Sequence, residues 1–275
     1  MSKRLGFLGP EGTYTEQAAL NYDPEAELVP YPSFPAVASA VESGEVDEGV
    51  LPIENSLEGA VTFTLDLLIH DSALSIRQEL VLRIDHCLVV RPGTKIEDIE
   101  LIYSHPQALA QCRNFLAERF RDASVAASLS TAAAVQEMQK SDVVAAAIAN
   151  RRAATLNGAH ILLEGIQDDR SNETRFVVLS LNDHVRTGAD KTSMCFDFED
   201  DAPGILYTVL GEFAQRGINL TKIESRPTRA NLGRYIFLVD VEGHRDEETM
   251  KEALDAVRGQ VSKFKIFGSY PKHVS

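Results

Sequence analysis

The chain has 275 residues, 44% of them hydrophobic, and a formal net charge of −14. This length accommodates two ordinary domains, since domains commonly run about 100–200 residues. The sequence holds no apolar stretch near the roughly 20 residues of a membrane helix, no secretory signal at MSKRLGFLG and no lysine- or arginine-rich run, so we expect a cytoplasmic protein that binds neither membranes nor nucleic acid. Widely spaced cysteines without CxxC, and histidines without HxxxH or HExxH, predict neither disulfides nor a metal site.

Residues 1–180 alternate short apolar runs with helical patterns, which is typical of an α/β fold with a largely parallel sheet. The candidate strands are 5–8, 49–53, 80–90, 101–103, 125–127, 143–147, 160–163 and 174–181. Thr13-x-x-Glu16 matches a capping box, and we expect Ser33 and Ser104 to cap later helices.

The polar stretch 182–191 contains a glycine and no apolar periodicity, so it predicts a linker between a domain at 1–182 and another at 192–275. The second domain follows the order strand, helix, strand, strand, helix, strand, at 192–198, 203–215, 218–226, 234–241, 246–257 and 261–269. This βαββαβ order predicts a ferredoxin-like fold.

A glycine turn, Gly9 to Tyr14, lies between a predicted strand and a helix. Glycine lets the backbone approach a ligand closely, and the free N–H groups of a helix start attract an anion. A plain tight turn explains the same residues equally well, because such turns are common in α/β proteins.

Polar residues Glu54, Asn55 and Ser56 end a buried strand, where ligands settle in open α/β sheets. Asn55 and Ser56 can donate hydrogen bonds to a ligand. An ionised Glu54 would repel an anion unless it is paired or protonated. Structural and catalytic roles for Glu54 therefore both stay open.

Two later segments repeat this design. The segment Ser104-His105-Pro106-Gln107, which continues to Gln111, places polar side chains at a strand end where they can contact a ligand. The alternative is simple helix capping by Ser104, with Gln111 on the surface. In the second segment, the small residues of 130–133 leave room for a ligand.

The polar segment 172–176 enters the last predicted strand of the first domain. Here Arg175 offers a planar fork to a carboxylate, or pairs internally with an acid such as Asp168 or Asp169.

Taken together and in order, the segments GPEGTYTEQAA, LPIENS, SHPQALAQC, STAAA and NETRF resemble the motifs of the prephenate dehydratase family. The resemblance covers essentially the first 180 residues. It implies a two-lobed fold similar to periplasmic ligand-binding proteins, with the chain crossing between lobes near residues 80 and 160. It also implies that the chain converts prephenate to phenylpyruvate, with aromatisation as the driving force and without cofactor or metal.

The same resemblance assigns roles to residues. Thr174 acts on the departing hydroxyl, and because a threonine hydroxyl is a weak acid we expect it to stabilise developing charge. Arg175, Glu54 and Asn55 complete the catalytic set. The expected substrate-binding residues are Thr13, Ser56, Ser104, Gln107, Gln111 and Phe176.

The second domain resembles an ACT domain of the phenylalanine-sensing type, through DAPGIL at 201–206 and GINLTKIESRP at 217–227. This implies feedback inhibition by L-phenylalanine enclosed between paired domains, and hence a homodimer or homotetramer; a module for dimerisation alone is the alternative. Ile205 departs from the alanine that is commoner at its position. The expected effector-binding residues are Gly204, Ile205, Leu206, Asn219, Glu224, Ser225, Arg226 and Pro227.

Other functions compete with this prediction. A non-catalytic solute receptor fits the lobed fold, but the segment Thr174-Arg175-Phe176 favours an enzyme. An arogenate dehydratase performs the same elimination on a substrate that carries an amine instead of the keto group, and the sequence leaves both substrates open. The acidic composition, with more arginine than lysine, raises the further hypothesis of adaptation to salt.

Overall fold

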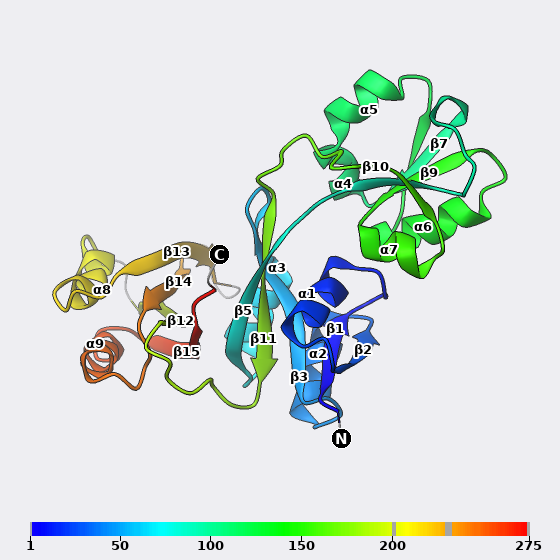
Figure 1. Ribbon diagram of the computed structural model, residues 1–275. Coiled ribbons are helices and arrows are strands. Elements are labelled where there is room, and N and C mark those ends of the chain that lie inside the picture. The colour runs from blue at the N-terminus through cyan, green and yellow to red at the C-terminus, as the bar shows by residue number, and fades with distance from the viewer. Residues whose placement is uncertain (1, 200–201, 229–232, 274–275) are drawn as a thin grey trace. The chain divides into compact units, whose positions relative to one another are not determined.

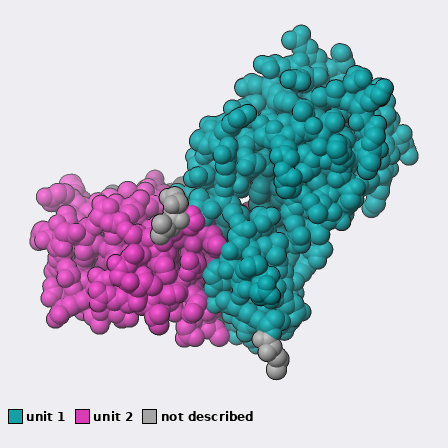
Figure 2. Space-filling model, viewed as in Figure 1, with its two compact units in different colours: residues 1–61, 81–176 teal, residues 62–80, 177–275 magenta. Residues whose placement is uncertain are grey.

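A computed structural model describes residues 2–199, 202–228 and 233–273 (Figure 1). The chain forms two compact units, residues 1–61 with 81–176 and residues 62–80 with 177–275 (Figure 2). Two of the three limits between the units fall within the strands β5 (Ser75–Arg83) and β11 (Glu173–Ser180), and the third falls at the start of helix α3 (Thr62–Asp66). Within the described residues, none of the helices has the length and apolar character needed to span a membrane.

The first sheet has the strand order β2-β1-β3-β11-β5, with β4 paired to β3. Its strands are β1 (Arg4–Leu8), β2 (Glu27–Tyr31), β3 (Glu48–Asn55), β4 (Gly59–Ala60), β5 (Ser75–Arg83) and β11 (Glu173–Ser180). The helices α1 (Tyr14–Tyr22) and α2 (Phe34–Glu42) join the parallel strands β1, β2 and β3. The carboxyl ends of β1 and β3 therefore meet at one edge of the sheet, where a ligand site is expected.

The second sheet of this unit has the order β10-β6-β9-β7-β8. Its strands are β6 (Cys87–Val90), β7 (Leu101–Ser104), β8 (Ser124–Ala127), β9 (Ala145–Ala149) and β10 (His160–Glu164). The helices packed around it are α4 (Pro106–Gln111), α5 (Arg113–Arg119), α6 (Thr131–Lys140) and α7 (Arg151–Leu156), with a 3-10 turn at Ile96–Asp98.

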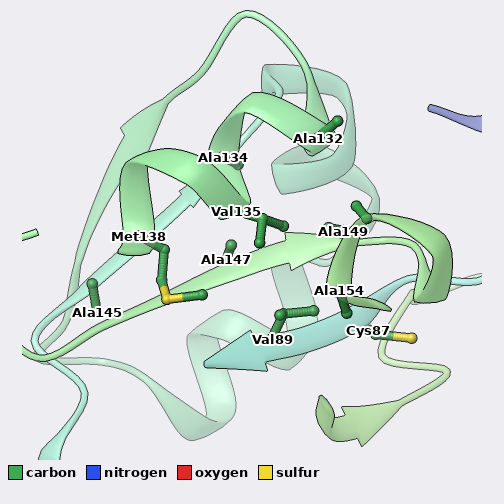
Figure 3. Close-up of a cluster of buried hydrophobic side chains, with 11 residues drawn as sticks. Cys87, Val89, Ala132, Ala134, Val135, Met138, Ala145, Ala147, Ala149 and Ala154 are labelled. Carbon is green, nitrogen blue, oxygen red and sulfur yellow. The ribbon is translucent and has the colours of Figure 1, made fainter. Parts of the chain in front are cut away.

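Strand β9 is buried on both faces, which explains its uninterrupted apolar sequence. Ala145, Ala147 and Ala149 pack with α6 and α7 on one face (Figure 3). Ala146 and Ile148 pack toward α4 and α5 on the other. Small alanines in the strand allow the helices to approach closely, so this lobe has an α/β core of three layers.

The second unit contains a four-stranded antiparallel sheet of order β13-β14-β12-β15. Its strands are β12 (Asp190–Asp197), β13 (Leu220–Pro227), β14 (Tyr235–Glu242) and β15 (Lys263–Pro271). The helices α8 (Ile205–Ala214) and α9 (Glu248–Arg258) share a core with this sheet. Helix α3 (Thr62–Asp66) and a π-helical turn (Leu67–Asp71) belong to the same unit. Asp201, part of the motif at 201–206, lies outside the described residues.

The fold class predicted from sequence is confirmed, with two α/β lobes and a ferredoxin-like βαββαβ unit. The predicted caps Thr13 and Ser33 are also confirmed, since each side-chain oxygen accepts an N–H from the first turn of its helix. Ser130 caps α6 in the same way, which the sequence analysis did not predict. Strand β2 was not predicted, because Pro30 lies inside a short and mixed run.

Three local predictions are wrong. The continuous run 80–90 is two strands, because at Ile84 and His86 the backbone bonds to residues 166–172 instead. The strand predicted at 143–147 lies two residues later, since Val143 is as apolar as the alanines that follow. Ser104 caps no helix: it ends β7 and donates to the Ile148 carbonyl at 2.7 Å, while His105 Nδ1 caps α4.

Candidate active site

Asn55, at the end of β3, joins several predicted site residues. Its Oδ1 accepts the backbone N–H groups of Leu57 and Glu58, both at 3.0 Å. Its Nδ2 donates to Thr174 Oγ1 and to Asn172 Oδ1, both at 2.8 Å. Asn55 is 7% exposed and Thr174 8%, so these bonds form away from bulk water. The end of β3 is thereby tied to the start of β11.

The network continues from Asn172 to Gln111, His86 and Tyr14. Asn172 Nδ2 donates to Gln111 Oε1 at 3.0 Å, and His86 Nε2 lies 2.9 Å from the same oxygen. His86 Nδ1 lies 3.1 Å from the Tyr14 hydroxyl, which donates to the Asp85 carbonyl at 2.7 Å. Burial lowers the pKa of His86, which favours its neutral form. Gln111 is therefore an internal partner, and the alternative of a surface position is wrong.

Glu54 and Arg175 form an ion pair, with 3.3 Å between Oε2 and Nη1. An internal ion pair for Arg175 is thus present, but not with the acids expected from sequence. Asp168 accepts the backbone N–H groups of Asn114 and Phe115, and Asp169 accepts from Ser171. Because the guanidinium offsets the charge of Glu54, an anion can approach this edge of the sheet with less repulsion.

Ser56 fastens the same two strands from the exposed side. Its Oγ accepts the Glu173 N–H at 2.9 Å and donates to the Ser171 carbonyl at 3.2 Å. Thr13 donates to the Leu8 carbonyl at 3.3 Å and caps α1.

Gly12 precedes Thr13 with a φ of +83°, and a Cβ there would lie 3.1 Å from the Cα of Ala153. Only glycine fits this close approach. The Gly12 N–H already donates to Glu16 Oε2 at 2.5 Å, so that N–H faces its own helix rather than an open anion site.

Three predicted substrate-binding residues occupy other settings. Ser104 is 0% exposed and bonded to Ile148, and the ring of Phe176 is 1% exposed within the core. Gln107 is exposed on the first turn of α4. The structure therefore joins Asn55, Thr174 and Gln111 in one network, and these three residues lie outside it.

Sequence reasoning did not single out Asn172, His86 or Tyr14. Asn172 and Tyr14 lie inside the motifs NETRF and GPEGTYTEQAA, but there the roles were assigned to the nearby residues Thr174 and Thr13. A lone buried histidine has no spacing signature. The detectable signal was the polar pair Asp85-His86 inside the run 80–90, whose only other charged residue is Arg83.

A cavity of about 460 Å³ opens beside Tyr14 in the first unit. Four arginines dominate its charged lining. Three of them are paired, Arg83 with Asp85 at 3.2 Å, Arg151 with Glu164 at 2.5 Å and Arg152 with Glu16 at 2.9 Å, and the fourth is Arg170. None of the predicted substrate residues lines this cavity. It is therefore distinct from the Asn55–Thr174 region.

In the second unit, the predicted effector residues divide into exposed and internally paired ones. Gly204 has a φ of +85° at the start of α8 and is exposed, as is Asn219. Arg226 is paired internally, with Nη2 at 3.4 Å from Asp66 Oδ1 and Nη1 donating to the Thr62 carbonyl at 3.4 Å.

The other predicted effector-binding residues lie in the first turn of α8 and on strand β13. Glu224 lies 3.4 Å from Lys222 Nζ. Ile205 and Leu206 are half-buried in the first turn of α8, while Ser225 and Pro227 are exposed on β13.

Comparison with known proteins identifies these features. The family model for prephenate dehydratase matches residues 5–184, and the model for the ACT domain matches residues 199–259. The bifunctional chorismate mutase/prephenate dehydratase of Aquifex aeolicus is 41% identical, over 98% of this chain and 74% of that protein.

Two solved structures are similar over nearly the whole chain. Prephenate dehydratase of Arthrobacter aurescens in complex with L-Phe is 38% identical, with a TM-score of 0.89 over 98% of this chain and 90% of that one. GqqA, described as a quorum quenching acylase, is 30% identical, with a TM-score of 0.88 over 98% of both chains.

Fold and site together define a metabolic α/β enzyme with an attached regulatory domain. The chain belongs to the prephenate dehydratase family, the lyases that convert prephenate to phenylpyruvate in aromatic amino-acid biosynthesis, and it carries an ACT domain. The resemblance drawn from its motifs is confirmed.

Proposed function

We propose that the region around Asn55 and Thr174 catalyses the decarboxylative dehydration of prephenate, with Thr174 at the departing hydroxyl. One observation carries this proposal: Asn55 Nδ2 donates to Thr174 Oγ1 at 2.8 Å. A hydroxyl that accepts a hydrogen bond on one side keeps its own proton for a partner on the other. Thr174 is thus prepared to donate to an oxygen on which negative charge develops.

The chemistry balances without a redox partner. The ring carboxylate leaves as carbon dioxide, and the electron pair of its carbon–carbon bond enters the ring. The ring carbon–oxygen bond breaks, and the departing hydroxide takes a proton to become water. Thr174 stabilises that oxygen while Arg175 holds a carboxylate of the substrate, with Glu54 keeping the guanidinium in place. Thr13, Ser56, Gln107 and Gln111 complete the proposed substrate site, and Ser104 and Phe176, which are fully buried, support it from the core.

Arg175→Lys is expected to raise KM for prephenate about tenfold, because an ammonium cannot replace the bidentate guanidinium and one good hydrogen bond to a charged group is lost. The turnover number should change less than KM. Steady-state rates of phenylpyruvate formation measure both. Arg113→Lys makes the same exchange at an exposed position of α5 and should leave both unchanged. An unaltered KM in Arg175→Lys would mean that Arg175 serves only its ion pair with Glu54.

The identity of the substrate is tested by parallel ultraviolet assays with prephenate and arogenate. We expect phenylpyruvate formation from prephenate to be the faster reaction. Faster conversion of arogenate would assign the amine-bearing substrate instead, without altering the assignment of the elimination to this site.

The 192–275 domain serves as the regulatory domain, with the 1–182 domain as the catalytic one, in a cytoplasmic homodimer or homotetramer. The start of α8 at Gly204 offers N–H groups to the carboxylate of L-phenylalanine. Large side chains on the second unit, Tyr207, Ile223 and Tyr235, are 80%, 48% and 47% exposed. Apolar exposure of this kind supports a face that a second copy covers.

L-Phenylalanine is therefore expected to bind, to inhibit phenylpyruvate formation and to stabilise a closed oligomer. Equilibrium dialysis measures the binding, rates with and without the amino acid measure the inhibition, and sedimentation measures the assembly. Absence of binding together with unaffected rates would reduce the domain to a module for dimerisation.

A further inference from the structure

A buried hydrogen-bonded chain runs from Thr174 through Asn55, Asn172 and Gln111 to His86. Asn172 is 0% exposed and His86 2%, and neither has a role in the function proposed above. Each amide in the chain has two orientations, because its oxygen accepts and its nitrogen donates. The orientations decide whether Asn55 donates to Thr174.

The backbone fixes the first orientation. Leu57 N–H and Glu58 N–H both donate to Asn55 Oδ1 at 3.0 Å. A backbone N–H only donates, so Asn55 Nδ2 must be the atom that faces Thr174 and Asn172. Thr174 Oγ1 therefore accepts, and its proton is directed elsewhere.

The following orientations are then determined in turn. Asn172 Oδ1 accepts from Asn55, so Asn172 Nδ2 donates to Gln111 Oε1. His86 Nε2 lies 2.9 Å from that same oxygen. An amide oxygen only accepts, so His86 must carry a proton on Nε2 in either charge state. Its Nδ1 carries no proton in the neutral ring and lies 3.1 Å from the Tyr14 hydroxyl, whose single proton is shared between Nδ1 and the Asp85 carbonyl.

We propose that His86 is a positioning residue for the reaction: its Nε2–H keeps the Gln111 oxygen toward Asn172 and thereby keeps Asn172 Oδ1 as a second acceptor of the Asn55 amide that donates to Thr174. This proposal rests on the dehydratase function proposed above. Without that donor, the Gln111 amide can turn and present its nitrogen to Asn172 Nδ2. Asn172 cannot turn to match, because the backbone holds Asn55 and two amide nitrogens would then face each other. Asn172 would instead move away, and the Asn55 amide beside Thr174 would lose one of the groups that position it. The mismatch of the amides reaches Thr174 because the groups in the chain are buried, where no water can replace a lost hydrogen-bond partner.

A matched pair of variants tests the proposal. His86→Gln retains an N–H donor near the position of Nε2, whereas His86→Leu removes it. We expect His86→Leu to lower kcat about tenfold, as for one hydrogen bond lost at a buried group, with KM within about twofold, and we expect His86→Gln to restore most of it. If His86 served only to pack its surroundings, both variants would lower the thermal midpoint and leave kcat per folded enzyme unchanged. That result would overturn the proposal.

A double-mutant cycle tests whether His86 acts through Gln111. Once Gln111→Leu has removed the amide, His86→Leu should cost little more, because the shared interaction is already gone. Multiplied losses of kcat in the double variant would mean independent roles and would overturn the proposal.

The tautomer can be read in the wild-type chain. Long-range proton–nitrogen NMR of the histidine rings, assigned by the signal lost in His86→Gln, shows which ring nitrogen is protonated. A proton on Nε2 supports the proposal, and a neutral ring protonated only on Nδ1 overturns it. This measurement is decisive even if the chain forms no phenylpyruvate, an outcome that would contradict the proposed function by itself.

Discussion

Thr174→Val is expected to lower the turnover of prephenate by about 10²–10³, the usual cost of removing one donor from a site where oxygen charge develops. Valine keeps the shape of threonine and removes only the hydroxyl. The fold should survive, because Asn55 Nδ2 still donates to Asn172 Oδ1 and to the Glu173 carbonyl at 3.1 Å. Phenylpyruvate absorbance at saturating prephenate measures the effect.

Thr174→Ser provides the matched control, because serine retains the hydroxyl that Asn55 addresses. It should keep most of the activity, although its freer side chain lowers the fraction of enzyme in the productive orientation. Urea unfolding of both variants separates turnover from stability. If Thr174→Val turned over prephenate at the wild-type rate, Thr174 would have no part in the elimination.

Local patterns were sufficient for much of the fold. The βαββαβ order of the second unit was predictable because its strands alternate and its helices are amphipathic, and the positive φ of Gly217, +70°, ends α8 where the glycine suggested. Patterns failed where two elements share one apolar run. The run 80–90 has no glycine or proline between β5 and β6, and the tertiary contacts of Ile84 and His86 divide it there.

For the site, the sequence predicted individual residues but not their contacts. Asn55 and Thr174 are 119 positions apart, and they meet because β11 lies beside β3 in the sheet. The same strand order explains why Arg175 pairs with Glu54 rather than with its sequence neighbours Asp168 and Asp169. Strand order is set by long-range packing, which periodicity does not encode.

At Ser104, tertiary structure overrides a local preference of the sequence. A serine before Pro106 at the end of a strand is typical of a helix cap. Here the Ser104 hydroxyl donates a hydrogen bond to the Ile148 carbonyl of the neighbouring strand β9, and the next residue, His105, caps the helix instead. Burial of Ser104 makes this outcome favourable, because an unbonded hydroxyl in the core is costly.

Asn55→Asp is expected to lower turnover by about 10²–10³ and the free energy of unfolding by about 1–3 kcal/mol. One carboxylate oxygen can still accept from Leu57 and Glu58 N–H, so the turn after β3 persists. The other oxygen replaces a donor by an acceptor toward Thr174 and Asn172. The Thr174 hydroxyl would then donate its hydrogen bond to the carboxylate and could not donate it to the departing hydroxyl.

Asn21→Asp makes the same chemical change on the exposed face of α1, where Asn21 Oδ1 accepts from Gln17 at 2.9 Å. Its turnover and stability should match the wild type, which excludes the added charge itself as the cause. Asn55→Asp separates two explanations that an alanine variant would merge. It preserves the contacts with the N–H groups of Leu57 and Glu58 and changes only the bonds that Nδ2 makes to Thr174, Asn172 and the Glu173 carbonyl. Wild-type turnover in Asn55→Asp, with the expected loss of stability, would show that Asn55 supports the fold and that the direction of its bond to Thr174 is irrelevant to the elimination.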